Sequence, residues 1–344
     1  MIRCGHKQGE FGENRPSQIP IGVNPNTGET EPLPGRDLQV PPDVRPHTLN
    51  ERDAVRDLRL AISRNAPAIA GALGVVWLAQ AQEITAGDIA TAGLSGPALN
   101  RIRESYETFG AEKLTEQWQR TAAAGASNVE PGIVSRFGMM EGILPDVALP
   151  GIDADQWIRA RRLDLVQRLT DEQMRASRKV IQAGLDQGLN SNVIARRLRP
   201  SIGLTSREAA SVEKLRAGLI RSGVSESNAA TAAGKKARRL LKVRAKRIAV
   251  TESTWAYNMG QLDAVKAYRD AGWFPPNVTI AKVWRKVLPV QECFCEALDG
   301  QILQIDSTFP GATPQVRNIL TPPAHPNCAC VIDIVVLQAG ELAA

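Results

Sequence analysis

The chain has 344 residues, with 42 Lys and Arg against 36 Asp and Glu, so its net charge is +6. This length leaves room for two domains or one large one, and it can fold without disulfide or metal staples. Aromatic residues make up only 4% of the chain, which favours helix over sheet. The modest positive charge permits a nucleic-acid partner without requiring one. No basic segment followed by an apolar run opens the chain, so we expect no secretory signal.

Residues 1–46 are predicted to form an extended arm, because closely spaced prolines interrupt every possible helix. The prolines are Pro16, Pro20, Pro25, Pro32, Pro34, Pro41, Pro42 and Pro46. Such a segment cannot bury enough apolar surface to fold alone. It is either a disordered tail or an arm that becomes ordered on a partner, and the sequence leaves both open. Cys4 and His6 could bind a metal, but one such pair in an arm is weak evidence.

A helical pattern begins near Thr48 and continues to Gly272. Val55, Leu58 and Ile62 mark one face of a first helix. The longest apolar stretch, Ala66 to Ala79, is shorter than the roughly 20 residues that cross a bilayer. We therefore expect a buried helix there and no membrane partner.

Capping signals divide the middle of the chain. Thr170 precedes two acidic residues, an arrangement typical of a helix start, and Thr205 and Glu208 have capping-box spacing. The predicted helices run from Thr170 to near Gly188, from Asn190 to Pro200, and from Thr205 to Gly223.

The segment 235–247 reads KKARRLLKVRAKR and is predicted to be a basic helix with one apolar face. One interpretation is a solvated face on a core helix. The other is a surface that contacts DNA or an acidic partner, and salt-sensitive binding would separate the two. No aromatic residues interleave, so stacking on single strands is not expected. The candidate contact residues are Lys235, Lys236, Arg238, Arg239, Lys242, Arg244 and Lys246.

After Gly272 the pattern changes from helix to strand. Two runs rich in β-branched residues, Val278–Val287 and Cys330–Leu337, are predicted strands separated by a loop region. The predicted fold class is α+β and predominantly α, with a helical N-terminal two-thirds and a small C-terminal α+β module. The predicted parts are 1–46 (arm), 47–170 (helical domain), 171–272 (helical segment leading into the module), 273–337 (Cys/His module) and 338–344 (tail).

Four of the five cysteines lie in that last module, together with one histidine. Thiolates and imidazoles at close spacing suit a structural zinc, which we name as the candidate cofactor. The candidate ligands are Cys293, Cys295, His325, Cys328 and Cys330. Two alternatives stay open, namely disulfides and free thiols.

Catalysis finds little support in the sequence. A nucleophilic cysteine paired with His325 is conceivable, but no orienting residue or oxyanion motif accompanies it. The chain contains no P-loop, no G-x-G-x-x-G and no H-E-x-x-H. We therefore expect a protein that is not an enzyme.

Several motifs in the C-terminal third resemble the Mu F-like domain of phage head-morphogenesis proteins. Residues 247–252 fit the family pattern R-x-A-x-T-E, with Asn258 and Gly260 following, and Trp284 lies on the strand before the cysteines. Residues 293–300 are similar to C-x-x-C-x-x-L-x-G, shortened by one between the cysteines. Residues 322–330 are similar to P-P-x-H-P-x-C-R-C, with Ala329 in place of arginine. The resemblance covers roughly residues 180–337, including the stretch from Gly184 to Leu219.

This resemblance implies a minor capsid protein of the virion. It implies association with the portal vertex inside the head, synthesis in the host cytoplasm, and roles in head morphogenesis and DNA packaging or delivery. The implied partners are the portal protein, the major capsid or scaffolding protein, and phage DNA. Two other classes remain as alternatives: a zinc-stabilised nucleic-acid-binding protein, and an enzyme injected into the host.

Overall fold

The computed structural model describes residues 47–49, 54–90, 93–134, 136, 154–286, 294–310 and 318–338. Of these residues, 71% are helical and 10% lie in strands, and the sheet is small and C-terminal. The predicted class, α+β with helix predominant, is confirmed at that level. The predictions for the arm 1–46, for Cys293 and for residues 339–344 lie outside the described residues.

Chain contacts divide the protein into two compact units that are each discontinuous in sequence. Unit 1 combines the described residues up to Ala66 with Glu116–Ile158 and those from Ile248 onward. Unit 2 combines Pro67–Thr115 with Arg159–Arg247. The sequence-based boundaries at residues 170 and 272 stay predictions.

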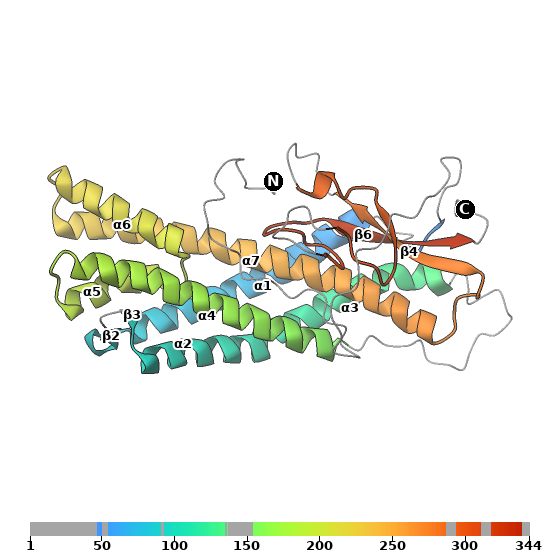
Figure 1. Cartoon of the computed structure of the whole chain (residues 1–344), viewed down its shortest axis with the longest axis horizontal. Helices are drawn as coiled ribbons and strands as arrows, with labels where there is room; N and C mark the ends of the chain where they lie inside the picture. The colour runs from blue at the N-terminus through green and yellow to red at the C-terminus, as the bar shows by residue number, and fades with distance from the viewer. Residues whose placement is uncertain are drawn as a thin grey trace. The chain divides into compact units, whose positions relative to one another are not determined.

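Unit 1 contains a four-stranded antiparallel sheet with the order β1-β6-β4-β5 (Figure 1). Its strands are β1 (His47–Thr48), β4 (Val278–Arg285), β5 (Ile302–Gln304) and β6 (Val331–Gln338). The two long strands pair along their whole length, from Val278 opposite Gln338 to Arg285 opposite Val331. The two predicted strands are thus confirmed to within two residues. β1 was not predicted, and it adds the segment before the first helix to a sheet formed near the end of the chain.

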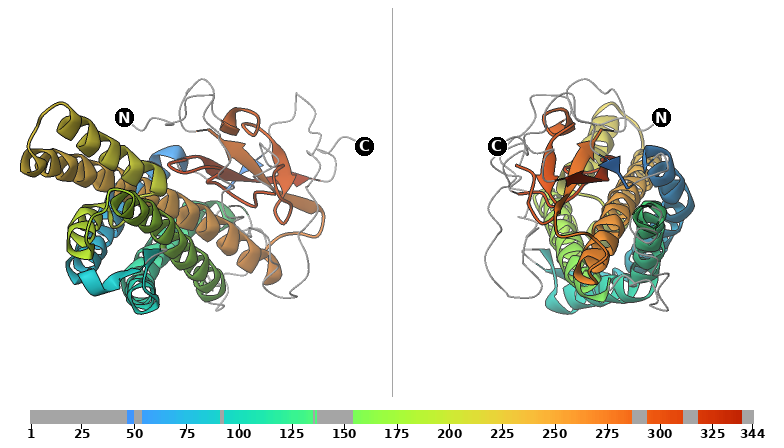
Figure 2. Two further views of the ribbon diagram at one scale, coloured as in Figure 1. Left: turned by 60° about the vertical axis from the view of Figure 1, so that its left-hand side comes forward. Right: turned by 90° about the vertical axis from the view of Figure 1, so that its right-hand side faces the viewer.

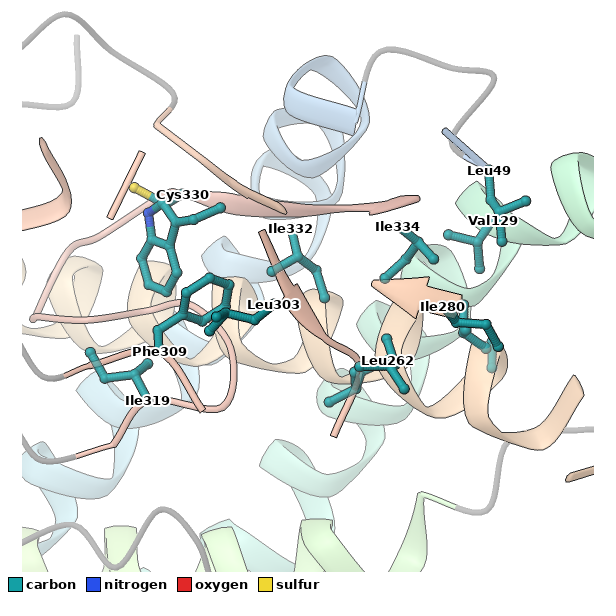
Figure 3. Packing of buried hydrophobic residues seen from close by; sticks show 14 of the residues in the cluster. Leu49, Val129, Leu262, Ile280, Leu303, Phe309, Ile319, Cys330, Ile332 and Ile334 are labelled. Carbon is teal, nitrogen blue, oxygen red and sulfur yellow. The ribbon is translucent and has the colours of Figure 1, made fainter. Parts of the chain in front are cut away.

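Both faces of β4 and β6 are buried, which explains their nearly continuous apolar sequences. On one face, Ile280, Ile332 and Ile334 join a core with Leu262 and Val129, shown in Figure 3. On the other face a smaller cluster forms from Ala281, Val283, Val335 and Leu337.

Two helices of unit 1 approach each other closely at glycines. These are α3 (Thr115–Ile133) and the second part of α7 (Glu226–Asp270). A Cβ added at Gly260 would lie 2.0 Å from the backbone oxygen of Ala122, and one at Gly125 would lie 2.0 Å from that of Tyr257. Only glycine permits this backbone-to-backbone contact, so Gly260 has a packing role.

Unit 2 is built almost entirely of helices. They are α1 (Ala54–Glu83, from Pro67 on), α2 (Gly96–Phe109), α4 (Asp155–Leu185, from Arg159 on), α5 (Ser191–Leu198), α6 (Ser206–Arg221) and the first part of α7. Figures 1 and 2 show α6 beside that part of α7. The shorter elements of unit 2 are η1 (Ala86–Asp88), β2 (Ile89–Ala90), β3 (Gly93–Leu94), the π-helix η2 (Gly110–Leu114) and η4 (Arg199–Ser201). One further short helix, η5 (Phe294–Glu296), belongs to unit 1.

Two of the predicted helix starts are confirmed and one is wrong. The Asn190 side chain accepts a hydrogen bond from the amide of Val193, and Thr205 and Glu208 form a reciprocal capping box. Thr170, in contrast, lies inside α4, which begins at Asp155. Its hydroxyl donates to the carbonyl of Val166 at 2.9 Å, a bond that a threonine inside a helix can make without capping anything.

The apolar stretch 66–79 is part of a longer and less buried helix than predicted. Ile69, Leu73 and Trp77 are buried, but Val75 and Leu78 are 69% and 61% exposed. The helix spans 30 residues, and by length and composition alone it is the one described helix that could cross a membrane. The predicted burial therefore holds for one face of this stretch, and the expectation of no membrane partner stays a prediction.

Candidate metal centre and basic helix face

Three cysteines converge in unit 1, and we refer to Cys295, Cys328 and Cys330 as the thiol cluster. Their sulfur atoms all lie within 4.8 Å of one another and are buried. The Sγ atoms of Cys295 and Cys328 are 3.6 Å apart, far longer than a disulfide bond of about 2.05 Å. None of these three cysteines forms a disulfide bond among the described residues.

Turns anchored on the sheet bring the two cysteine-bearing segments together. The carbonyl of Cys295 accepts hydrogen bonds from the amides of Leu298 and Asp299, at 3.3 and 3.0 Å. The next residue, Gly300, has a φ of +83°, and its amide donates to the carbonyl of Trp284 in β4 at 2.9 Å. The other two cysteines lead directly into β6, the neighbour of β4. Pairing of β4 with β6 therefore places all three sulfurs side by side.

Helix α7 fixes the second segment through two side chains. Asn258 donates to the carbonyl of Cys330 at 3.1 Å and accepts from the amide of Ile332 at 2.8 Å. Thr251 accepts from the amide of Asn327 at 2.8 Å. These bonds satisfy buried backbone groups next to the cysteines.

His325 lies against the thiol cluster, next to Cys328. Its Nδ1 is 3.0 Å from the carbonyl oxygen of Pro326, and its ring is hydrogen-bonded to Cys328. Burial raises the pKa of the Cys328 thiol, but hydrogen bonds from Cys295, Cys330 and His325 outweigh it, so this pKa lies well below its usual value. The thiolate is the form that binds metals.

The thiol cluster could hold a metal ion. Tetrahedral zinc with Zn–S bonds of about 2.3 Å places its sulfur ligands about 3.8 Å apart, close to the 3.6 Å between Cys295 and Cys328. Of the five ligands predicted from sequence, the structure gathers three and places His325 beside one of them. Cys293 lies outside the described residues.

The predicted basic helix forms part of α7 in unit 2, and the structure separates its cations into two groups. Lys235, Arg238, Arg239, Lys242 and Lys246 are exposed. Lys236 is only partly exposed and donates to the carbonyl of Ser211 at 2.6 Å. Arg244 is buried and paired with Glu172 and Glu208. Lys236 and Arg244 therefore hold helices of unit 2 together, and Arg244 is withdrawn from the predicted contact residues.

Lys282 is a buried residue that sequence reasoning missed. Its Nζ donates to the carbonyls of Ile305 and Leu320 at 3.0 and 2.8 Å, and it lies 5.5 Å from the centroid of the Phe309 ring. Lys282 thus joins β4 to two loop segments. The alternation of side chains along β4 could have predicted this burial, because Lys282 points to the same face of the strand as Ile280 and Trp284.

No family model, no curated protein and no solved structure matches this chain.

Proposed function

We propose that this protein is a minor head protein of a tailed phage, of the Mu F-like head-morphogenesis family. It would associate with the portal vertex and with major capsid or scaffolding subunits, inside the head. Its action would be in head assembly and in DNA packaging or delivery. The supporting observation is that the motifs carrying the resemblance, far apart in sequence, meet at one place. Thr251 and Asn258 bond to the segment Asn327–Ile332, and Cys295 lies against Cys328.

The burial of the thiol cluster favours an assembly role over catalysis. Cys295, Cys328 and Cys330 are 0%, 1% and 5% exposed. A catalytic metal or nucleophile needs an open position for substrate, whereas structural sites are closed. We therefore expect the cluster to stabilise the fold of unit 1.

Zinc is the metal we propose for this site. Three thiolates and one further ligand in a closed tetrahedral set suit zinc. The fourth ligand would be either Cys293 or His325, which would coordinate through Nε2 while Nδ1 donates to the carbonyl of Pro326. Bound zinc would cross-link β6 to the turn after β4 and stabilise the folded state.

Co-assembly tests the proposed function. The full chain would be co-expressed with portal, scaffolding and major capsid proteins of the phage that encodes it, and assembled heads would be separated by sedimentation. We expect the chain in portal-containing heads at low copy number, and absent from heads assembled without portal. Recovery only from the soluble fraction would contradict the proposal.

Metal analysis of the purified protein tests the zinc site separately. We expect one zinc per chain in the wild type and its loss in Cys328→Ser. The matched control, Cys4→Ser, also removes one thiol and should retain the metal. Loss of zinc in His325→Ala with retention in Cys293→Ser would assign the fourth ligand to His325. A wild type free of zinc after purification without chelators would refute the site.

A further inference from the structure

Five exposed cations of α7 form a continuous line, which we call the outward stripe. Its residues follow one another at helical spacings of three or four, except for one adjacent pair, and therefore occupy one face of the helix. They are Lys235, the adjacent Arg238 and Arg239, Lys242 and Lys246. From the first to the last, the stripe extends about 16 Å along the helix axis. Residues 227–251 contain no Asp or Glu, so no acid on this part of α7 interrupts it.

The charges of the outward stripe are also uncompensated by the rest of the described chain. None of its five residues takes part in an ion pair among the described residues, whereas Arg244 on the opposite side of the helix is paired with Glu172 and Glu208. Solvated like charges at this spacing repel one another, and a bound polyanion relieves that repulsion. Acids on α4 and α6 thus neutralise the buried Arg244, whereas the five stripe residues face solvent.

The composition of the stripe discriminates between polyanions. Protein interfaces have apolar or aromatic centres and are depleted in lysine, but three of the five stripe residues are lysines and none is aromatic. Proteins that bind single strands stack bases on aromatic rings, which this stripe also lacks. A straight row of cations without a stacking group fits the phosphate backbone of a duplex, which carries one charge per about 1.7 Å of axis.

We infer that the outward stripe binds the phosphate backbone of duplex DNA without reading its sequence. The inference needs only unit 2 and does not rest on the family or on the metal. Phosphate contacts of this kind position a protein on DNA and release counterions, so the affinity must fall steeply with salt.

Fluorescence anisotropy with the full chain and a labelled duplex of about 20 base pairs tests this. Five phosphate contacts give a slope of log affinity against log salt of about −4.5, or about a 500-fold loss between about 50 and about 200 mM salt. A variant with Lys235, Arg238, Arg239, Lys242 and Lys246 all changed to Gln should bind at least about 100-fold more weakly at low salt, with a slope near zero. Two duplexes of unrelated sequence should bind equally.

The matched control neutralises five other exposed cations of unit 2, namely Arg175, Lys179, Arg196, Lys214 and Arg221, again by Gln. Both variants lower the net charge by five, from +6 to +1. The control should keep the wild-type slope to within about 1. Equal losses in the two variants would reduce the effect to net charge and overturn the inference. Tighter binding of poly-glutamate or of single-stranded DNA than of the duplex would also overturn it. Circular dichroism of both variants verifies that α7 is intact.

Discussion

The side-chain amide of Asn258 in α7 donates to the backbone carbonyl of Cys330 at 3.1 Å, while its oxygen accepts from the amide of Ile332 at 2.8 Å. One fully buried side chain therefore satisfies the backbone on both sides of Val331, the first residue of β6. This clamp fixes the start of β6 to α7, and with it the position of the cysteines.

Replacing Asn258 by Ala should destabilise unit 1, because it leaves a buried carbonyl and a buried amide without partners. We expect a loss of about 2–4 kcal/mol in the free energy of unfolding. Urea denaturation measures the loss, and faster hydrogen exchange at the amide of Ile332 locates it. Asn192→Ala, at an exposed position of α5, should change stability by less than about 0.5 kcal/mol. Unchanged exchange at Ile332 would be inconsistent with the clamp.

Alanine at Gly260 or Gly125 should separate α3 from α7. Each new Cβ would meet a backbone oxygen at 2.0 Å, and backbone cannot move aside as a flexible side chain can. We expect a destabilisation of about 1–3 kcal/mol or more in thermal or urea unfolding. Gly218→Ala in α6 is the control, because open space surrounds that position. There the better helix propensity of alanine should stabilise by up to about 1 kcal/mol. Similar effects at all three positions would refute the close contact.

Lys282 should make stability depend on pH. Burial lowers its pKa most, the charge of Lys266 lowers it further, and Asp306 only partly offsets them, so the pKa in the folded protein lies well below 10.5. The unfolded chain then holds a proton that the folded protein has released, and stability increases with pH in this window. Above this lowered pKa and below the unfolded value of about 10.4, the contribution is up to about 1.4 kcal/mol per pH unit.

The variant Lys282→Met should lose this pH dependence, whatever its stability at neutral pH. Urea unfolding at several pH values gives the two slopes, and Lys179→Met at an exposed site of α4 should behave as the wild type. Measurements end below pH 10, above which two of the buried tyrosines, Tyr106 and Tyr268, act in the opposite direction. Burial raises the pKa values of Tyr106 and Tyr268 to about 12, so unfolded tyrosines ionise first and stability falls. Parallel slopes for wild type and Lys282→Met would disprove the effect.

Arg244 and Lys242 should give opposite results although both are cations of α7. Arg244→Gln removes the partner of Glu172 and Glu208 and should cost about 2 kcal/mol, less than a fully buried pair because Glu172 is partly exposed. It should leave the salt slope of DNA binding unchanged. Lys242→Gln should leave stability unchanged and reduce the slope by about 1. A variant of Arg244 that flattened the slope would contradict the division of cations between interior and stripe.

Local patterns were sufficient for the elements with strong signals. The caps at Asn190 and Thr205 predicted α5 and α6, because a capping side chain bonds only to the turn beside it. The β-branched runs predicted β4 and β6. The helix start predicted at Thr170 was wrong. A threonine that can begin a helix is also tolerated inside one when its hydroxyl donates to a carbonyl of the preceding turn.

For the candidate metal site, the sequence determined which types of ligand are present. The tertiary structure decided which of the candidate residues lie close enough together to form the site. Clustered cysteines and a histidine already favoured a soft metal. Only strand pairing brought Cys295 to 3.6 Å from Cys328 and placed His325 beside Cys328. Likewise, the sequence alone shows the row of cations in α7. Which cation is neutralised depends on Glu172 and Glu208, which lie on other helices.

The sequence by itself determined the helical character of the chain, its basic segment and its thiol-rich end, because propensity, capping and periodicity act over a few residues. The tertiary structure alone decided the addition of β1 to the sheet, the burial of Lys282, and the contact of Gly260 with Ala122. These features depend on contacts between segments far apart along the chain, which local energetics do not specify.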